Sequence, residues 1–511
     1  MAINNRTTNT LKNIGFGFIS KIVNLILPFI IRTVIIYKLG AEYTGLSSLF
    51  TSILQVLSVT ELGFSSAIVY NLYKPISEGS KSDICEWLTL YRWVYHRVGW
   101  IILFAGLILT FFLNLVIKGD YPNDINIYVL FLIYLMNTVI SYFAFSYKNV
   151  LLIGYQRRDI LSNIEMAVSI LRSVIQIIIL VLFQNYYFFV MLIPLSTIIL
   201  NIIVEIVTRV KFPDLVCGNF VDKNRLKLIS KQVTGVAIGR ISLIARNSFD
   251  SIILSAVCGL TTVVVYSNYY FIFNAVGQIL GVIISSMVAS IGNSLVTESL
   301  QKNYEDHNKF DFIYMWIVGW CTICLFCLYQ PFMKMWVGAE LVAPNSTMYL
   351  FCIYFYVNQL AQIRSAYSEA AGLWWKFRYI VIAEMIANVV LNFVLGFYFE
   401  MNGILIATIV TSFFSSFVGI SIIVFRDFFK KRYTGFFLNN LFYFCSTALA
   451  LCITYFIIRH VYVEGLVGLL LKVIICGVSP NIVYSVIYLC IPRYKNIILW
   501  GIKNVSIIKC L

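Results

Sequence analysis

The sequence is poor in charged residues. Only 12% of its 511 residues are Asp, Glu, Lys or Arg, whereas soluble globular chains contain about 25%. Hydrophobic residues make up 60%, and apolar runs of about 20 residues, long enough to cross a bilayer core, recur along the whole chain. The alternating pattern of a transmembrane barrel is absent. The composition therefore predicts an all-α polytopic membrane protein and excludes an ordinary soluble domain.

Motifs for enzymatic chemistry are also missing. The sequence contains no GxxxxGK[ST] phosphate-binding loop, so we expect no ATPase domain in it. The 12 cysteines follow no framework typical of a secreted domain. Cys321, Cys324 and Cys327 lie in an apolar run at a spacing that does not gather them on one tight helix face. We expect no enzymatic activity, no metal site and no cofactor.

The apolar runs predict about 14 transmembrane helices. They cover residues 14–37, 44–73, 94–117, 125–147, 160–183, 186–208, 232–256, 262–297, 312–333, 346–372, 379–399, 402–425, 436–458 and 466–490. About 26 Lys and Arg residues fall on one side of these spans and about 4 on the other, which predicts that both termini are cytoplasmic. The net charge of +15 is then explained by topology signals and contacts with anionic lipids, and nucleic acid is not an expected partner.

Weak internal matches at nearly one shift indicate a repeat. Gly40 in YKLGAEYTGLSSLF matches Gly259 in SAVCGLTTVVVYSNYY at a shift of 219, Val98-Gly99-Trp100 matches Val318-Gly319-Trp320 at 220, and Glu165-Met166 matches Glu384-Met385 at 219. The shift spans six helices, an even number, so the two copies are expected to have the same orientation.

The repeat predicts the domain boundaries. We expect an N-lobe of helices 1–6 over residues 1–210, a cytoplasmic linker over 211–231 and a C-lobe of helices 7–12 over 232–425. Two extra helices follow over 426–491. An amphipathic cytoplasmic tail over 492–511 is expected to lie at the membrane surface.

Several ionisable residues lie inside the predicted spans, where a charge that faces lipid costs at least a few kcal/mol. A shift of 219 relates Lys21 to Arg240, so the first helix of each lobe has a cation roughly 12 Å from its cytoplasmic end. These two residues line a cavity between the lobes or snorkel to the interface. Arg172 and Arg364 are candidates for the same cavity or for structural ion pairs.

Two acidic residues are candidates for ion coupling. Asp250 lies four residues after Arg246 on one helix face, so this pair contacts cargo or an ion, or joins helices structurally. Glu61, in TELGFSSA, lies near mid-membrane. It pairs with a cation such as Lys21 or Arg172, or it binds a transported proton.

The sequence resembles the MOP (multidrug/oligosaccharidyl-lipid/polysaccharide) flippase superfamily in three features. These are TELGFSSA in the second helix, RNSFDSIILSAVCG before VYSNYY, and the repeated set of six helices. The resemblance is to the polysaccharide transporters, which include O-antigen and capsule repeat-unit flippases. The extra helix pair is similar to the lipid II flippase branch. The resemblance implies two lobes around a central cavity and alternating access in a bacterial cytoplasmic membrane.

The cargo that the resemblance implies is an undecaprenyl-pyrophosphate-linked oligosaccharide, moved from the cytoplasmic to the outer leaflet for surface polysaccharide assembly. Its anionic head suits a passage lined by Lys21, Arg240, Arg246, Arg172 and Arg364, because cations form charge-assisted hydrogen bonds with pyrophosphate. A polysaccharide polymerase is a possible partner. The alternatives are a cation-coupled multidrug exporter of the same superfamily and a membrane-embedded polymerase or ligase.

The cavity assignment makes a direct prediction. Replacing Lys21 and Arg240 together by Ala removes the symmetric pair among the five cations that would bind the pyrophosphate, so export of surface polysaccharide should stop while the protein still inserts into the membrane. Quantifying surface polysaccharide and membrane-inserted protein in the same cells measures both effects. Unchanged surface polysaccharide would contradict the assignment.

Overall fold

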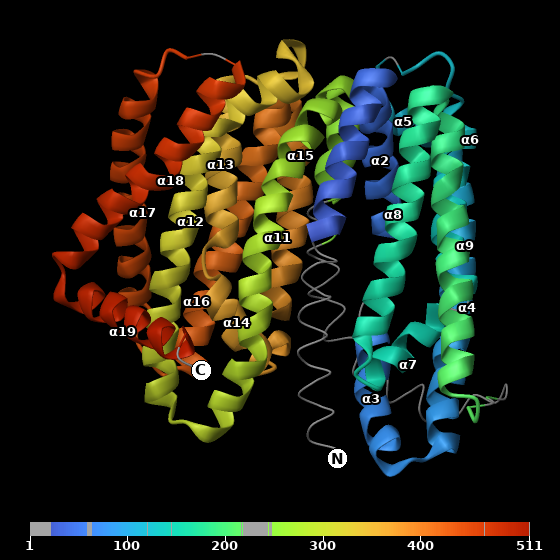
Figure 1. The fold of residues 1–511 in the computed structure, drawn as a ribbon, viewed down its shortest axis with the longest axis horizontal. Helices are drawn as coiled ribbons and strands as arrows, with labels where there is room; N and C mark the ends of the chain where they lie inside the picture. Colours follow the sequence, from blue (N-terminus) through green and yellow to red (C-terminus); the bar gives the residue numbers. More distant parts are fainter. Residues whose placement is uncertain are drawn as a thin grey trace. The chain divides into compact units, whose positions relative to one another are not determined.

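The described residues form helices and no strand. In this computed structural model they are residues 22–58, 64–119, 121–144, 146–215, 217, 244, 248–463 and 465–509. Eight of the described helices are long and apolar enough to cross a membrane, so the chain is a multi-pass membrane protein. The predicted all-α membrane fold is confirmed (Figure 1).

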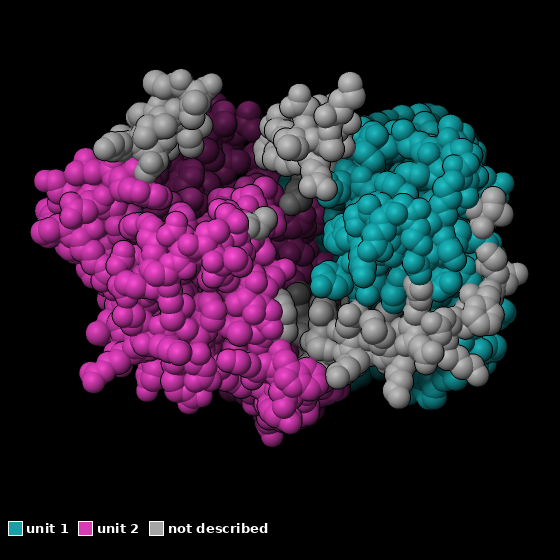
Figure 2. All heavy atoms as spheres, turned by 90° about the horizontal axis from the view of Figure 1, so that it is seen from below, with its two compact units in different colours: residues 1–264 teal, residues 265–511 magenta. Residues whose placement is uncertain are grey.

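The chain divides into two compact units, residues 1–264 and 265–511 (Figure 2). Unit 1 contains a helix over residues 22–38, then α2 (Glu42–Leu57), α3 (Phe64–Glu78), α4 (Lys81–Thr110), α5 (Leu113–Val116), α6 (Ile127–Phe143), η2 (Ser146–Lys148), α7 (Asn149–Gly154), α8 (Arg158–Leu182), α9 (Tyr186–Lys211) and the helix Ser248–Cys258. Its core is formed by buried aliphatic and aromatic side chains from α2, α4 and α6.

Unit 2 begins within α11 (Leu260–Thr297). The helices that follow are α12 (Leu300–Val337), η3 (Ala339–Leu341), α13 (Asn345–Gln359), α14 (Gln362–Ala370), α15 (Trp374–Thr411), η4 (Ser412–Gly419), α16 (Ile420–Ile423), η5 (Val424–Phe428), α17 (Thr434–Arg459), α18 (Gly465–Leu489) and α19 (Pro492–Lys509). Glu400, with φ of 52°, separates two helical segments within α15, where the sequence predicted two spans. The predicted lobe boundaries themselves stay predictions.

Two helices begin well before the apolar runs that predicted them. α4 begins at Lys81 and α12 at Leu300, whereas the predicted spans begin at 94 and 312. Each helix is capped by a serine, because Ser80 Oγ accepts from the Asp83 amide at 3.4 Å and Ser299 Oγ from the Lys302 amide at 3.2 Å. Hydropathy locates only the apolar part of such a helix.

The backbone repeats with the shift that the sequence predicted. Ser80 and Ser299 are 219 positions apart, and so are Gly40 and Gly259. Both glycines adopt positive φ, 128° and 89°, in the turns before α2 and α11. A side chain is rarely tolerated there, which explains why glycine stands at both positions.

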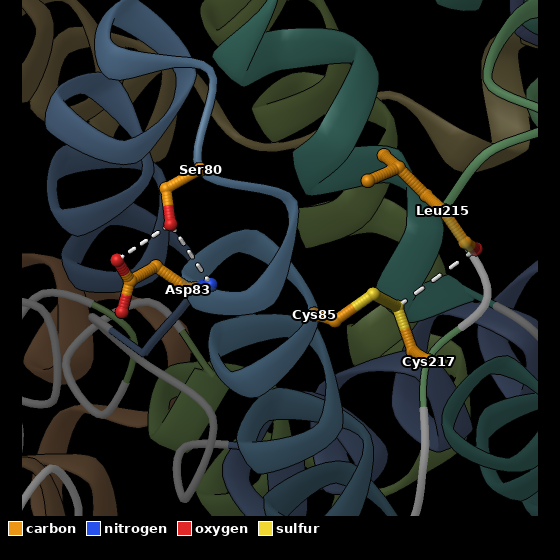
Figure 3. Close-up of a disulfide and its surroundings, with 5 residues drawn as sticks. All are labelled: Ser80, Asp83, Cys85, Leu215 and Cys217. Atoms are coloured by element: carbon orange, nitrogen blue, oxygen red, sulfur yellow. Dashed lines mark hydrogen bonds between the residues drawn. A yellow bond between two sulfur atoms is a disulfide. The ribbon is translucent and has the colours of Figure 1, made fainter.

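A disulfide joins Cys85, on α4, to Cys217, which follows α9, across 132 positions of sequence (Figure 3). Lys81 Nζ donates to Asp214 Oδ2 at 2.8 Å between the same two segments. This hydrogen bond and the Lys81 charge lower the pKa of the Asp214 carboxyl group below its usual value. Cysteine spacing did not reveal the pair, because sequence alone does not show that α4 meets the end of α9.

The disulfide can be tested in a variant that keeps Cys85 and Cys217 as its only cysteines. Mild oxidation should link them within one chain, because the fold brings their side chains together. Mass spectrometry of peptides released without reduction measures the link. A variant that keeps Cys85 and Cys258, a free cysteine in the structure, is the control, and equal cross-linking in that control would contradict the predicted proximity.

Candidate functional site

The charged residues within apolar helices are the candidates for function. Four of the seven predicted site residues lie outside the described residues: Lys21, Glu61, Arg240 and Arg246. The structure places the other three. Arg172 and Asp250 belong to unit 1 and Arg364 to unit 2, so their arrangement into one site stays a prediction.

Arg172 lies near the middle of α8, about 21 Å along the helix from Arg158. Its side chain is half-buried, and Nη1 donates to Ser196 Oγ of α9 at 3.4 Å. The buried Nε makes no hydrogen bond. Within the described part of the chain, no carboxylate forms an ion pair with this guanidinium, so Arg172 retains donors for an anion.

Arg364 lies in the first turn of α14. Ala361 adopts a left-handed conformation with φ of 62° and ends α13, which breaks the predicted single span into two helices. Arg364 is only 2% exposed. Its Nη2 donates to Ser365 Oγ and to the Ser416 carbonyl oxygen of the π-helical η4, both at 3.2 Å. Arg364 is therefore enclosed by its own unit.

A buried polar cluster surrounds Arg364 in unit 2. We define it as His307, Asp311, Arg364 and Asn440. His307 and Asp311 are four residues apart on one face of α12, and both are buried. Asp311 interacts electrostatically with Arg364, as Glu384 does, and lies beside Asn440 of α17. The cluster joins α12, α14 and α17 through one cation and its acidic neighbours.

His307 lies against the aromatic side of this cluster. Its ring centroid is 5.5 Å from that of Tyr367, 5.4 Å from Phe425 and 5.3 Å from Phe429. These rings exclude water from the imidazole and come from α14 and the segment around η5. The cluster is thus closed by aromatic packing.

Asp250 is fully buried in the helix Ser248–Cys258. The neighbouring Ser248 Oγ donates to Gln55 Oε1 of α2 at 3.3 Å, which attaches this helix to unit 1. The predicted pairing of Asp250 with Arg246 stays a prediction, as does its role in ion coupling.

Uncharged polar residues inside the helices were not among the predicted site residues. Asn388 Nδ2 donates to Thr408 Oγ1 at 3.1 Å and to Thr411 Oγ1 at 3.2 Å, across the two segments of α15. His307 and Asp311 were also absent from the predicted site residues. The signal that could have identified them is polar residues at helical spacing: Thr408 and Thr411 lie inside an apolar run, and His307 and Asp311 directly precede one.

Comparison with known proteins places the fold. No family model and no curated protein matches the sequence. Among solved structures, the lipid II flippase MurJ in an inward closed conformation is 16% identical, with a TM-score of 0.63, over 94% of this chain and 99% of its own.

Two MATE structures are also similar. An inward-facing multidrug resistance MATE transporter of the MOP superfamily is 14% identical, with a TM-score of 0.62, over 78% of this chain and 92% of its own. MATE in its bent conformation is 14% identical, with a TM-score of 0.52, over 78% and 91%. The predicted MOP resemblance is confirmed at the level of the fold.

The role of Arg364 can be tested through stability. Arg364→Met removes the buried cation that Asp311 and Glu384 interact with, so the variant should lose about 3 kcal/mol of unfolding free energy. Thermal unfolding of the purified protein in detergent measures the loss. Arg432→Met removes an exposed arginine of the same unit and should change little, whereas an equal effect of both substitutions would contradict the structural role of Arg364.

Proposed function

We propose that this protein is a flippase that moves undecaprenyl-pyrophosphate-linked oligosaccharide units from the cytoplasmic to the outer leaflet of a bacterial cytoplasmic membrane by alternating access. Arg172 carries the proposal, because a guanidinium within a membrane-spanning helix has no carboxylate partner among the described residues. Such a group suits an anionic head that enters a wet passage, and its planar fork donates paired hydrogen bonds to phosphate oxygens.

The extent of the structural likeness also supports a lipid-linked cargo. The lipid II flippase MurJ covers 94% of this chain, and the inward-facing MATE transporter covers 78%. The part of this chain that MurJ covers in addition is long enough to include the two extra helices, α17 and α18. A polyprenyl-linked sugar has an apolar tail that can remain in lipid while the head crosses.

The proposal also assigns roles to the remaining predicted site residues. Lys21, Arg240 and Arg246 would bind the pyrophosphate together with Arg172, and Glu61 and Asp250 would bind the coupling ion. Arg364 was predicted to bind substrate directly. Its enclosure within unit 2 favours support of the lobe over contact with cargo. The surface polysaccharide would be an O-antigen or capsule, and a polysaccharide polymerase would receive the exported unit.

Multidrug export is the second candidate, because the MATE transporters have the same fold. An exporter of organic cations would favour acidic residues in its passage. Without Arg364, the predicted passage contains four cations and two acids, namely Lys21, Arg172, Arg240 and Arg246 against Glu61 and Asp250, so an anionic cargo fits better.

A deletion strain tests the proposal. Without the protein, lipid-linked oligosaccharide should accumulate on the cytoplasmic face, which extraction and mass spectrometry of the lipid-linked pool would show. Increased drug sensitivity with no accumulation would contradict the flippase and support the exporter.

Expression of variants in the same deletion strain tests whether Arg172 contributes to export. Arg172→Gln removes the charge but keeps a polar side chain, and loss of a charge-assisted hydrogen bond should lower export roughly tenfold. Arg158→Gln, at the exposed start of the same helix, is the matched control and should restore export. Full export by Arg172→Gln would separate Arg172 from the cargo.

A further inference from the structure

Unit 1 contains a cavity of about 610 Å³ that the transport proposal does not use. It is bounded by α4, η2, α7, α9 and the residues after α9, and no residue of α2 or α3 lines it. The lining residues are Leu88, Thr89, Arg92, Tyr147, Lys148, Leu151, Glu205, Thr208, Arg209, Phe212, Pro213, Leu215 and Cys217. All of them belong to the described part of unit 1.

The cavity is positively charged. Arg92, Lys148 and Arg209 line it, and Glu205 is the one acid among its lining residues. Glu205 is buried and forms ion pairs with two of the cations. Lys148 Nζ lies 2.5 Å from Glu205 Oε2, and Arg209 Nε lies 2.5 Å from Glu205 Oε1. Three positive charges against one negative charge leave the cavity at +2.

Arg92 is the cation that Glu205 does not pair with. Its guanidinium carbon lies 5.7 Å from the centroid of the Tyr147 ring, so the aromatic face holds the group at the cavity wall. Within the described part of the chain, Arg92 forms no ion pair. One cavity is therefore lined by three cationic groups: the guanidinium groups of Arg92 and Arg209 and the ammonium group of Lys148.

The location fits an anion at the membrane surface. Arg209 lies in the last turn of α9, at the end that the distribution of basic residues predicts to be cytoplasmic. Phosphates of the anionic lipids in that leaflet lie at this depth and attract basic groups. The Lys81–Asp214 ion pair also joins the segment after α9 to α4 beside this cavity.

We propose that this cavity binds a phosphate group, with Arg92 and Lys148 as its principal contacts and Glu205 holding Lys148 and Arg209 in place. The phosphate can belong to an anionic phospholipid headgroup or to free inorganic phosphate. Arginine and lysine donors converging on one hollow are the side chains that phosphate oxygens prefer. The site is independent of the transported cargo.

Binding to the delipidated, full-length protein tests the proposal. Native mass spectrometry in detergent would follow titration with short-chain phosphatidylglycerol, phosphatidylcholine and inorganic phosphate. Arg92→Gln and Lys148→Gln should each weaken phosphatidylglycerol binding about tenfold, the effect of one charge-assisted hydrogen bond. Arg97→Gln is the matched control. It removes an exposed arginine of α4 that stacks on Trp93 outside the cavity, and it should leave binding unchanged.

The probes separate the two sources of phosphate. Displacement of phosphatidylglycerol by inorganic phosphate would support a site for the free ion, and resistance to displacement would support a lipid headgroup site. Phosphatidylglycerol binding that Arg92→Gln and Lys148→Gln both leave unchanged would overturn the proposal, and so would equal effects of Arg92→Gln and Arg97→Gln. Thermal unfolding of each variant shows that a loss of binding is not a loss of folding.

Discussion

A charge among apolar membrane helices has to be compensated, and this constraint organises the charged residues of both units. Glu205, near the end of α9, is compensated by two cations, Lys148 of η2 and Arg209 of α9. Arg364 is compensated inside unit 2 by Asp311, Glu384 and polar oxygen atoms. Arg172 has one hydroxyl partner and a buried Nε without a hydrogen bond. This incomplete compensation makes Arg172 the described residue best suited to an anionic cargo.

The two units share a backbone scaffold and differ in their charges. Gly40 and Gly259 repeat with the same backbone conformation, and the serine caps of α4 and α12 repeat at the same shift. The charged residues of α4 and α12 have different surroundings. Arg92 is exposed and lines a cavity, whereas Asp311 is buried where α17 packs on α12. One of the two extra helices therefore encloses Asp311 within unit 2.

The sequence predicted the fold class and the repeat because both depend on long apolar runs and on glycines with a fixed backbone role. It placed the start of α12 about ten residues too late, since a capped polar extension has no hydropathy signal. The cargo role of Arg364 stays a prediction, and the sequence did not show that this side chain is buried within its own unit. The Cys85–Cys217 pair and the Asp311 environment depend on contacts between distant helices, which spacing along the chain does not encode.

The central claim is that the protein moves a lipid with an anionic, sugar-bearing head across the bilayer. Reconstitution of the purified protein into vesicles with a polyprenyl-pyrophosphate-linked oligosaccharide tests it most directly. A membrane-impermeant lectin added outside would measure how much of the lipid becomes accessible with time. The account predicts faster exposure than in protein-free vesicles. Equal rates with and without the protein, in vesicles shown to contain folded protein, would contradict it.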